Sequence, residues 1–120
     1  MPQKHAFVIF SGKTETSRVY HALAYAKQAH DRGDIAQLYF AAEGTYWPGA
    51  LAVKSHPMHA LFSDLQERKV IQGACQNCAN SFGHADSAAA CVGLIQGPEA
   101  SLGQIDIIGM EDIGFRVWNF

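Results

Sequence analysis

The chain has 120 residues, of which 48% are hydrophobic, so it is long and apolar enough to form one domain with its own core. Its formal net charge is −2, from 9 Lys and Arg against 11 Asp and Glu. This balance argues against a nucleic-acid-binding or anionic-membrane-binding surface, because phosphate binding needs clustered positive charge.

Cysteine usage and the N-terminal residues predict the compartment. The opening "MPQKHAFVIF" has no long apolar region before a small-residue cleavage site, so we read no secretory signal. No run approaches the roughly 18 apolar residues of a membrane-spanning helix. Three cysteines, an odd number, suit reduced thiols better than a disulfide framework. We expect a cytoplasmic protein without a membrane partner.

The first third of the chain reads as strand, loop and helix. The continuous apolar run 6–10 predicts a strand buried on both faces, as in a parallel sheet covered by helices. The polar loop "SGKTETS" follows, in which Thr14 or Thr16 is expected to cap a helix. Apolar residues then recur at helical spacing until Gly33, a natural stop. They are Val19, Ala22, Leu23, Ala26 and Ala29.

The pattern repeats in the middle of the chain. Residues 35–42 predict a second strand, and "EGTYWPG" (43–49) a loop at its carboxyl end. Pro57 suits the first position of a second helix. Its apolar face would consist of Met58, Leu61, Phe62 and Leu65. Residues 70–74 predict a third strand, directly followed by the pair Cys75 and Cys78.

The last third is less regular. The alanine-rich stretch after Gly83 predicts a short helix from about Asp86. Pro98 and Glu99 are helix-start signals, and the apolar run 105–108 is compatible with helix or strand. Residues 115–120 predict a closing strand. With no repeat or linker, residues 1–120 are expected to form one domain.

Alternating strands and helices predict an α/β domain of three layers, with a mainly parallel sheet of about five strands and helices on both faces. In such sheets, ligand and catalytic groups gather beyond the carboxyl ends of the strands. The loops "SGKTETS", "EGTYWPG" and "CQNCANSFG" should therefore meet at one edge.

The Cys-x-x-Cys pair permits several functions. A thiol is nucleophilic as its thiolate, and a nearby helix N-terminus lowers its pKa. Asn77, Asn80 and Ser81 could add hydrogen-bond donors near Cys78. The structural alternative is a small buried hydrophobic side chain, as free cysteines often are. Because Cys78 lies in a glycine-flanked loop at the expected edge, we favour the reactive thiol.

Zinc and thioredoxin-like chemistry are the rival interpretations. A Cys₃His zinc set would consist of Cys75, Cys78, His84 and Cys91. The segment lacks basic and aromatic nucleic-acid contacts, and an alanine-rich helix would carry Cys91 away. A thioredoxin motif follows the first strand of its unit, whereas this pair follows a later one. A reversible Cys75–Cys78 disulfide stays open, and we expect neither a metal nor a cofactor.

The segment "VIQGACQNCANSFG", placed after two strand–helix pairs, resembles the DsrE/DsrF-like family, which is similar to sulfur-relay subunits of the TusBCD type. The family has a reactive cysteine in a strand-to-helix loop, followed by a small residue and then a glycine. "CANSFG" (78–83) matches this pattern. The opening "FVIFSG", the long first helix and the chain length are also similar.

The resemblance implies a persulfide carrier: Cys78 would accept a sulfane sulfur from a donor protein and pass it to an acceptor thiol. Cys75 departs from the one-cysteine pattern; it would resolve the persulfide as a disulfide or serve another redox task. The last third matches the family poorly. Family members are usually oligomers, so a homo-oligomer (dimer, trimer or hexamer) is expected. Tyr46, Trp47 and Trp118 suit burial in such an assembly or in the core.

Two further features bear on substrate binding. "SGKT" resembles the end of a phosphate-binding loop, but the required glycine five positions before Gly12 is Phe7. A plain turn is the favoured interpretation. The backbone of Ser11 and Gly12 could still bind an anion, and Lys13 could steer an anionic sulfur donor. His84 could act as a base or cation near Cys78, or could simply be a surface or capping residue.

These observations lead to one hypothesis and one alternative. The hypothesis is a small sulfur-relay protein, a persulfide carrier or sulfurtransferase. The alternative is a non-catalytic binding or structural subunit of an oligomer, with a redox-active or zinc-bound Cys-x-x-Cys. Whether the protein turns over a substrate is left open.

Overall fold

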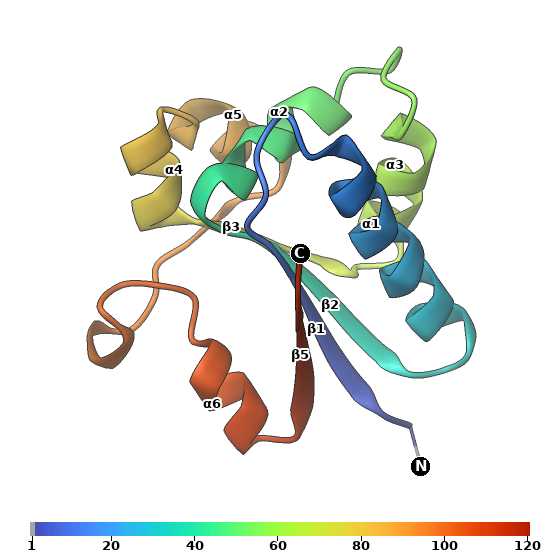
Figure 1. The fold of residues 1–120 in the computed structure, drawn as a ribbon, viewed down its shortest axis with the longest axis vertical. Helices are drawn as coiled ribbons and strands as arrows, with labels where there is room; N and C mark the ends of the chain where they lie inside the picture. The colour runs from blue at the N-terminus through green and yellow to red at the C-terminus, as the bar shows by residue number, and fades with distance from the viewer. Residues whose placement is uncertain (1) are drawn as a thin grey trace.

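The computed structural model describes residues 2–120, and in this range five strands form one parallel sheet. The strands are β1 (Lys4–Ile9), β2 (Ile35–Phe40), β3 (Ile71–Cys75), β4 (Leu94–Ile95) and β5 (Phe115–Asn119). Their order across the sheet is β4-β3-β2-β1-β5 (Figure 1). The prediction of an α/β domain with a parallel sheet of about five strands is confirmed.

Helices connect the strands and cover both faces of the sheet. The helices are α1 (Thr16–Asp31), α2 (Trp47–Leu51), α3 (His59–Glu67), α4 (Gln76–Phe82), α5 (Ala85–Cys91) and α6 (Ile107–Asp112). Two short 3₁₀ helices are η1 (Ala42–Tyr46) and η2 (Glu99–Ser101). Figure 1 shows α6 on the opposite side of the sheet from α1 and α3. Among residues 2–120, no helix is long and apolar enough to cross a bilayer.

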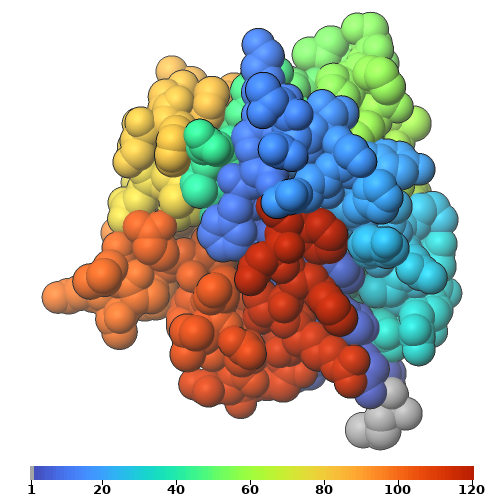
Figure 2. Space-filling model, viewed as in Figure 1, coloured from blue at the N-terminus to red at the C-terminus, as the bar shows by residue number. Residues whose placement is uncertain are grey.

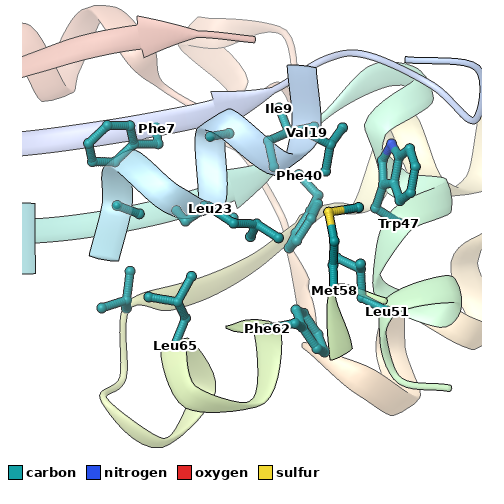
Figure 3. Packing of buried hydrophobic residues seen from close by; sticks show 14 of the residues in the cluster. Phe7, Ile9, Val19, Leu23, Phe40, Trp47, Leu51, Met58, Phe62 and Leu65 are labelled. Carbon is teal, nitrogen blue, oxygen red and sulfur yellow. The ribbon is translucent and has the colours of Figure 1, made fainter. Parts of the chain in front are cut away.

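The main core lies between the sheet and the helices α1, α2 and α3. Alternation along β1 directs Phe7 and Ile9 into this core and Val8 to the other face. The predicted helical stripe of α1, from Val19 to Ala29, is buried against the sheet (Figure 3). At its centre, the rings of Phe40 and Phe62 lie 6.5 Å apart, edge to face.

A smaller cluster occupies the other face of the sheet. Its buried members are Val8, Ala41, Cys75 and Ile105. Side chains from α6 and β5 pack against them. The connection between β4 and α6, here called the 96–106 loop, covers this face beside the carboxyl end of β3. Cys75 is therefore part of a packed cluster as well as of the candidate site.

Several local predictions were wrong in detail. No side chain caps α1, which starts at Thr16 after Glu15, so neither Thr14 nor Thr16 is a capping residue. Pro57 precedes α3 by two positions, because the helix starts at His59. The expected loop 43–49 is helical, running from η1 into α2 with Pro48 in its first turn.

The two-residue strand β4 was not predicted from the sequence. It pairs with the end of β3, where Ala74 aligns with Leu94 and Cys75 with Ile95. Gly73 has a φ of +151°, and a Cβ there would lie 3.0 Å from the Ile95 side chain. A glycine at this position lets the two strands approach. A strand this short has no periodicity of its own, so only its pairing reveals it.

Candidate cysteine site

Cys75 and Cys78 lie where β3 ends and α4 begins. Cys75 is the last residue of β3 and is fully buried. Cys78 lies in the first turn of α4 and is partly exposed. The backbone N–H of Cys78 donates to the Cys75 sulfur at 3.4 Å, so Cys75 is the N-cap of α4. The inner cysteine thus positions the outer one.

Gln104 joins both cysteines from a distant part of the chain. Its Oε1 accepts from the Cys78 thiol at 3.3 Å and from the Cys75 thiol at 3.6 Å. No sequence signal predicts this contact, because Gln104 lies in the 96–106 loop, 26 residues beyond Cys78. The tertiary fold alone brings the amide to the two sulfur atoms.

The 96–106 loop is closely packed against itself and against α4. A Cβ on Gly97 would lie only 1.9 Å from the carbonyl oxygen of Gln104, so glycine is required for this approach. Ser101 Oγ lies 2.8 Å from the same oxygen. Asn77 Nδ2 donates to the Leu102 carbonyl at 3.4 Å, which ties the loop to α4. These contacts hold Gln104 over the cysteines.

Ala42, the first residue of η1, approaches the site from the end of β2. Its φ of +50° places it in the left-handed region, which is uncommon for a residue with a Cβ. The backbone N–H of Ala42 forms a hydrogen bond with the Cys78 sulfur, and this bond lowers the pKa of the thiol. The strained residue therefore contributes a donor to the reactive group.

The net effect of the surroundings is to raise the pKa of Cys78. Burial is the largest cause, and the hydrogen bond with Cys75 raises the pKa further. The Ala42 N–H opposes both but does not reverse them. The sequence-based expectation of a lowered pKa is therefore wrong, because these surroundings favour the thiol of Cys78 over its thiolate.

An apolar cavity of about 360 Å³ lies beside the site, on the same side of the sheet as α6. It shares Ala41 and Gln104 with the surroundings of the cysteines. Its other apolar walls come from Phe10, Leu102, Ile105, Ile107 and Ile108. Leu102, at the tip of the 96–106 loop, is 83% exposed.

Comparison with known families agrees with this geometry. The model of the DsrE/DsrF-like family matches residues 3–120. The chain belongs to the DsrE/DsrF-like family. The match includes the last third of the chain, so the expectation of a poor match there is wrong. No curated protein sequence matches the chain.

In this DsrE/DsrF-like protein, the carboxyl ends of β1, β2 and β3 meet at one edge of the sheet, as their parallel order requires. Residues of the first loop contact the second: Trp47 Nε1 donates to the Ser11 carbonyl, and Gly12 lies against Glu43. Lys13 is exposed. The contacts described for Ser11 and Gly12 do not include the cysteine sulfurs, so their role in binding stays a prediction.

The remaining candidate residues have other surroundings. Asn77 holds the 96–106 loop, as described above, and Asn80 is exposed on α4. His84 is the N-cap residue of α5, and its ring packs edge-on against Tyr46 at 5.8 Å between centroids. The structure thus places His84 against an aromatic ring, and its side chain makes no capping hydrogen bond.

The zinc set is not assembled in this DsrE/DsrF-like fold. Cys91 ends α5 and lines a separate cavity with Gln66 and Ile71. Among residues 2–120, no group of three or more His, Cys, Asp or Glu side chains lies close enough together to hold a metal ion. The geometry therefore does not support the zinc-bound form of the alternative function.

The raised pKa leads to a prediction about reactivity. Alkylation of Cys78 is expected to be slower at neutral pH than that of a free cysteine, and to reach its plateau at a higher pH, because only the thiolate reacts. Substituting Cys75→Ala removes a thiol that raises this pKa, so the profile should move toward lower pH. Peptide-resolved mass spectrometry after timed iodoacetamide labelling measures both profiles.

A Cys91→Ser variant is the matched control, because Cys91 lies in a different cavity and should leave the Cys78 profile unchanged. The raised pKa of Cys78 would be contradicted if the alkylation rate of the wild type reached its plateau at a lower pH than that of a free cysteine. It would also be contradicted if the Cys75→Ala profile moved toward higher pH.

Proposed function

We propose that the protein is a sulfur-relay protein that carries sulfane sulfur as a persulfide on Cys78. The observation that carries the proposal is the position of this sulfur. It is partly exposed beyond β3, hydrogen-bonded to Gln104 and Ala42, and bordered by an apolar rim. Membership of the DsrE/DsrF-like family, which is associated with sulfur relay, supports the same chemistry.

The transfer needs no outside oxidant. Cys78, as thiolate, attacks the outer sulfur of a donor persulfide; the donor S–S bond breaks, and the donor leaves as a thiolate that takes up the proton lost by Cys78. An acceptor thiolate then attacks the outer sulfur on Cys78; the S–S bond to Cys78 breaks, and Cys78 leaves as a thiolate that takes up the proton lost by the acceptor thiol. Because the pKa of Cys78 is raised, we expect loading to depend on loss of the thiol proton, which the departing donor thiolate takes up.

Cys75 has a distinct role in this proposal. Its sulfur accepts from the Cys78 N–H and shares Gln104 with Cys78, so it lies beside the sulfur that would carry the persulfide. Attack of Cys75 on the inner sulfur of the Cys78 persulfide would form a Cys75–Cys78 disulfide and release hydrosulfide. Burial of Cys75 limits this competing reaction while the loop stays packed.

The proposed partners are a sulfur-donor protein and a sulfur-acceptor protein, and the working form is a homo-oligomer. The apolar rim at Leu102 and Phe10 is the proposed docking surface for donor and acceptor. The three cysteines are free thiols in the structure, which suits a reducing compartment such as the cytoplasm. Lys13 and the adjacent backbone are proposed to attract anionic donors.

The experiment is to load the reduced protein with a small-molecule persulfide and to measure intact and peptide masses before adding reductant. We expect the mass of one added sulfur atom on the Cys78 peptide, and complete loss of this product in Cys78→Ser. Cys91→Ser is the control and should load like the wild type. Loading of Cys78→Ser, or no loading of the wild type under conditions that load a known carrier, would refute the mechanism.

The second candidate function is a redox-active subunit that forms a Cys75–Cys78 disulfide without carrying sulfur. The shared contact with Gln104 and the hydrogen bond from the Cys78 N–H to the Cys75 sulfur favour it, because they hold the two cysteines together. The same mass measurement separates the two functions. Loss of two hydrogen atoms without any gain of sulfur would favour the disulfide function.

A further inference from the structure

Strand β5 forms one edge of the sheet and has a neighbour on one side only, β1. Figure 2 shows its residues (red) on the near surface of the molecule, between α1 (light blue) and α6 (orange). Trp118 on this strand is 44% exposed, and Arg116 is exposed. An edge strand with an exposed aromatic side chain is a template for pairing with another strand.

The hydrogen bonds to β1 show which backbone groups face outward. The Phe120 N–H donates to the Val8 carbonyl, and the Phe120 carbonyl accepts from the Phe10 N–H. Because backbone groups alternate along a strand, even-numbered residues of β5 point toward β1. The N–H and C=O groups of Phe115, Val117 and Asn119 therefore point to the open side of the edge.

We propose that two copies of this chain dimerise by antiparallel pairing of their β5 strands around a two-fold axis at Val117. In this register Val117 pairs with Val117 of the other copy, and Phe115 pairs with Asn119 of the other copy. Each of these pairs exchanges two N–H···O bonds, which satisfies the outward-facing groups identified above. The two sheets join into one continuous sheet, and the β5 edge of each copy is no longer open.

The side chains are self-complementary in the same register. Arg116 of one copy lies directly opposite Trp118 of the other, in a non-hydrogen-bonded pair whose Cα atoms are about 4.5 Å apart. This distance brings a guanidinium against an indole, a favourable cation–π pair, and the two-fold axis produces it twice. The Trp118 indole has a fixed orientation in the single chain, because its Nε1 donates to His5 Nδ1 at 3.1 Å.

The proposal specifies the interface of the proposed homo-oligomer and does not depend on sulfur transfer. β5 and the cysteine site belong to different parts of the sheet, since β1 and β2 separate β5 from β3. A monomer that loads sulfur on Cys78 would therefore refute the dimer alone. A dimer that does not load sulfur would refute the proposed sulfur-relay function alone.

The first test measures mass in solution by light scattering and sedimentation over a wide range of protein concentration. We expect the wild type to have twice the mass of the chain. Asn119→Pro should be monomeric, because proline removes an outward N–H that the dimer uses, and proline is tolerated on an open edge. Asn119→Ala is the matched control and should stay dimeric. Arg116→Ala should weaken dimerisation by about tenfold.

The second test is a cross-link that fixes the register. In hydrogen-bonded antiparallel pairs the Cα atoms are about 5.5 Å apart, within the range of a disulfide. Val117→Cys should therefore form a 117–117 disulfide between copies on mild oxidation, identified by peptide mapping. Arg116→Cys should not form a 116–116 disulfide, because residue 116 faces residue 118 of the other copy. A monomeric wild type would overturn the proposal. So would a dimer that persists in Asn119→Pro and forms no 117–117 disulfide in Val117→Cys.

Discussion

Substituting Gly44→Ala is expected to lower the free energy of unfolding by about 3 kcal/mol, through a clash with the sheet. A Cβ at this position would lie 2.1 Å from the carbonyl oxygen of Ile9 and 2.9 Å from its carbonyl carbon. Both are backbone atoms, so the clash cannot be relieved by a change of side-chain rotamer. The same oxygen accepts the Ala41 N–H at 2.8 Å, so its displacement also disrupts the link between β1 and η1.

Thermal and urea unfolding followed by circular dichroism measure this effect, and a drop in Tm of about 10 °C or more is expected. Gly12→Ala is the matched control in the neighbouring loop. A Cβ there would lie 3.1 Å from the Glu43 Cβ, and Gly12 has no positive φ, so the cost should be small. Equal stability of Gly44→Ala and Gly12→Ala would show that η1 does not pack on β1 as described.

Gly44 also matters for the cysteine site, since it follows Ala42 in η1. A displaced η1 should move the Ala42 N–H away from the Cys78 sulfur. Because this N–H lowers the pKa of Cys78, its loss should raise that pKa further. Any folded fraction of Gly44→Ala is therefore expected to alkylate at Cys78 more slowly than the wild type at the same pH.

Substituting Phe40→Ala is expected to lower the free energy of unfolding by about 3–5 kcal/mol, the usual cost of removing a buried aromatic ring. Phe40 is fully buried in β2, and its ring packs edge to face against Phe62 of α3 (Figure 3). The substitution removes the transfer free energy of the ring and leaves a cavity between the sheet and α3. The lost transfer free energy and the cavity both lower the stability of the folded state.

Phe82→Ala is the matched control, because Phe82 on α4 is 46% exposed and its removal leaves no enclosed cavity. Urea denaturation should show a change below about 1 kcal/mol for the control. A Phe40→Leu variant should lie between the two, since leucine fills part of the space. A loss at Phe40→Ala no larger than that at Phe82→Ala would contradict the packing of α3 on the sheet.

Much of the fold follows from short-range patterns. The apolar runs near Phe7, Leu38 and Val117 mark strands, and the helical stripe from Val19 to Ala29 marks the face of α1. These patterns are readable because the α1 stripe repeats with the helical period and β1 is a continuous apolar run, buried on both faces. Capping was harder to predict, because at α1 and α3 the helix starts have no side-chain hydrogen bond that would select Thr or Ser.

The candidate site was predictable only in part. Cys75 and Cys78 stood out because they follow a buried strand, and the parallel order of strands placed their edge correctly. The direction of the Cys78 pKa was not predictable, since it depends on burial and on the orientation of the Cys75 thiol. A nearby helix start suggested a lowered value, and desolvation outweighed it.

Residues that are neighbours along the chain were enough to predict the α/β class, the parallel sheet and the cysteine pair at its edge, because each depends on local patterns. The surroundings of those cysteines depend instead on segments that are distant along the chain. Gln104 reaches both sulfur atoms from the 96–106 loop, and Ala42 reaches Cys78 from the end of β2. These contacts join residues that are far apart along the chain, so no local periodicity predicts them.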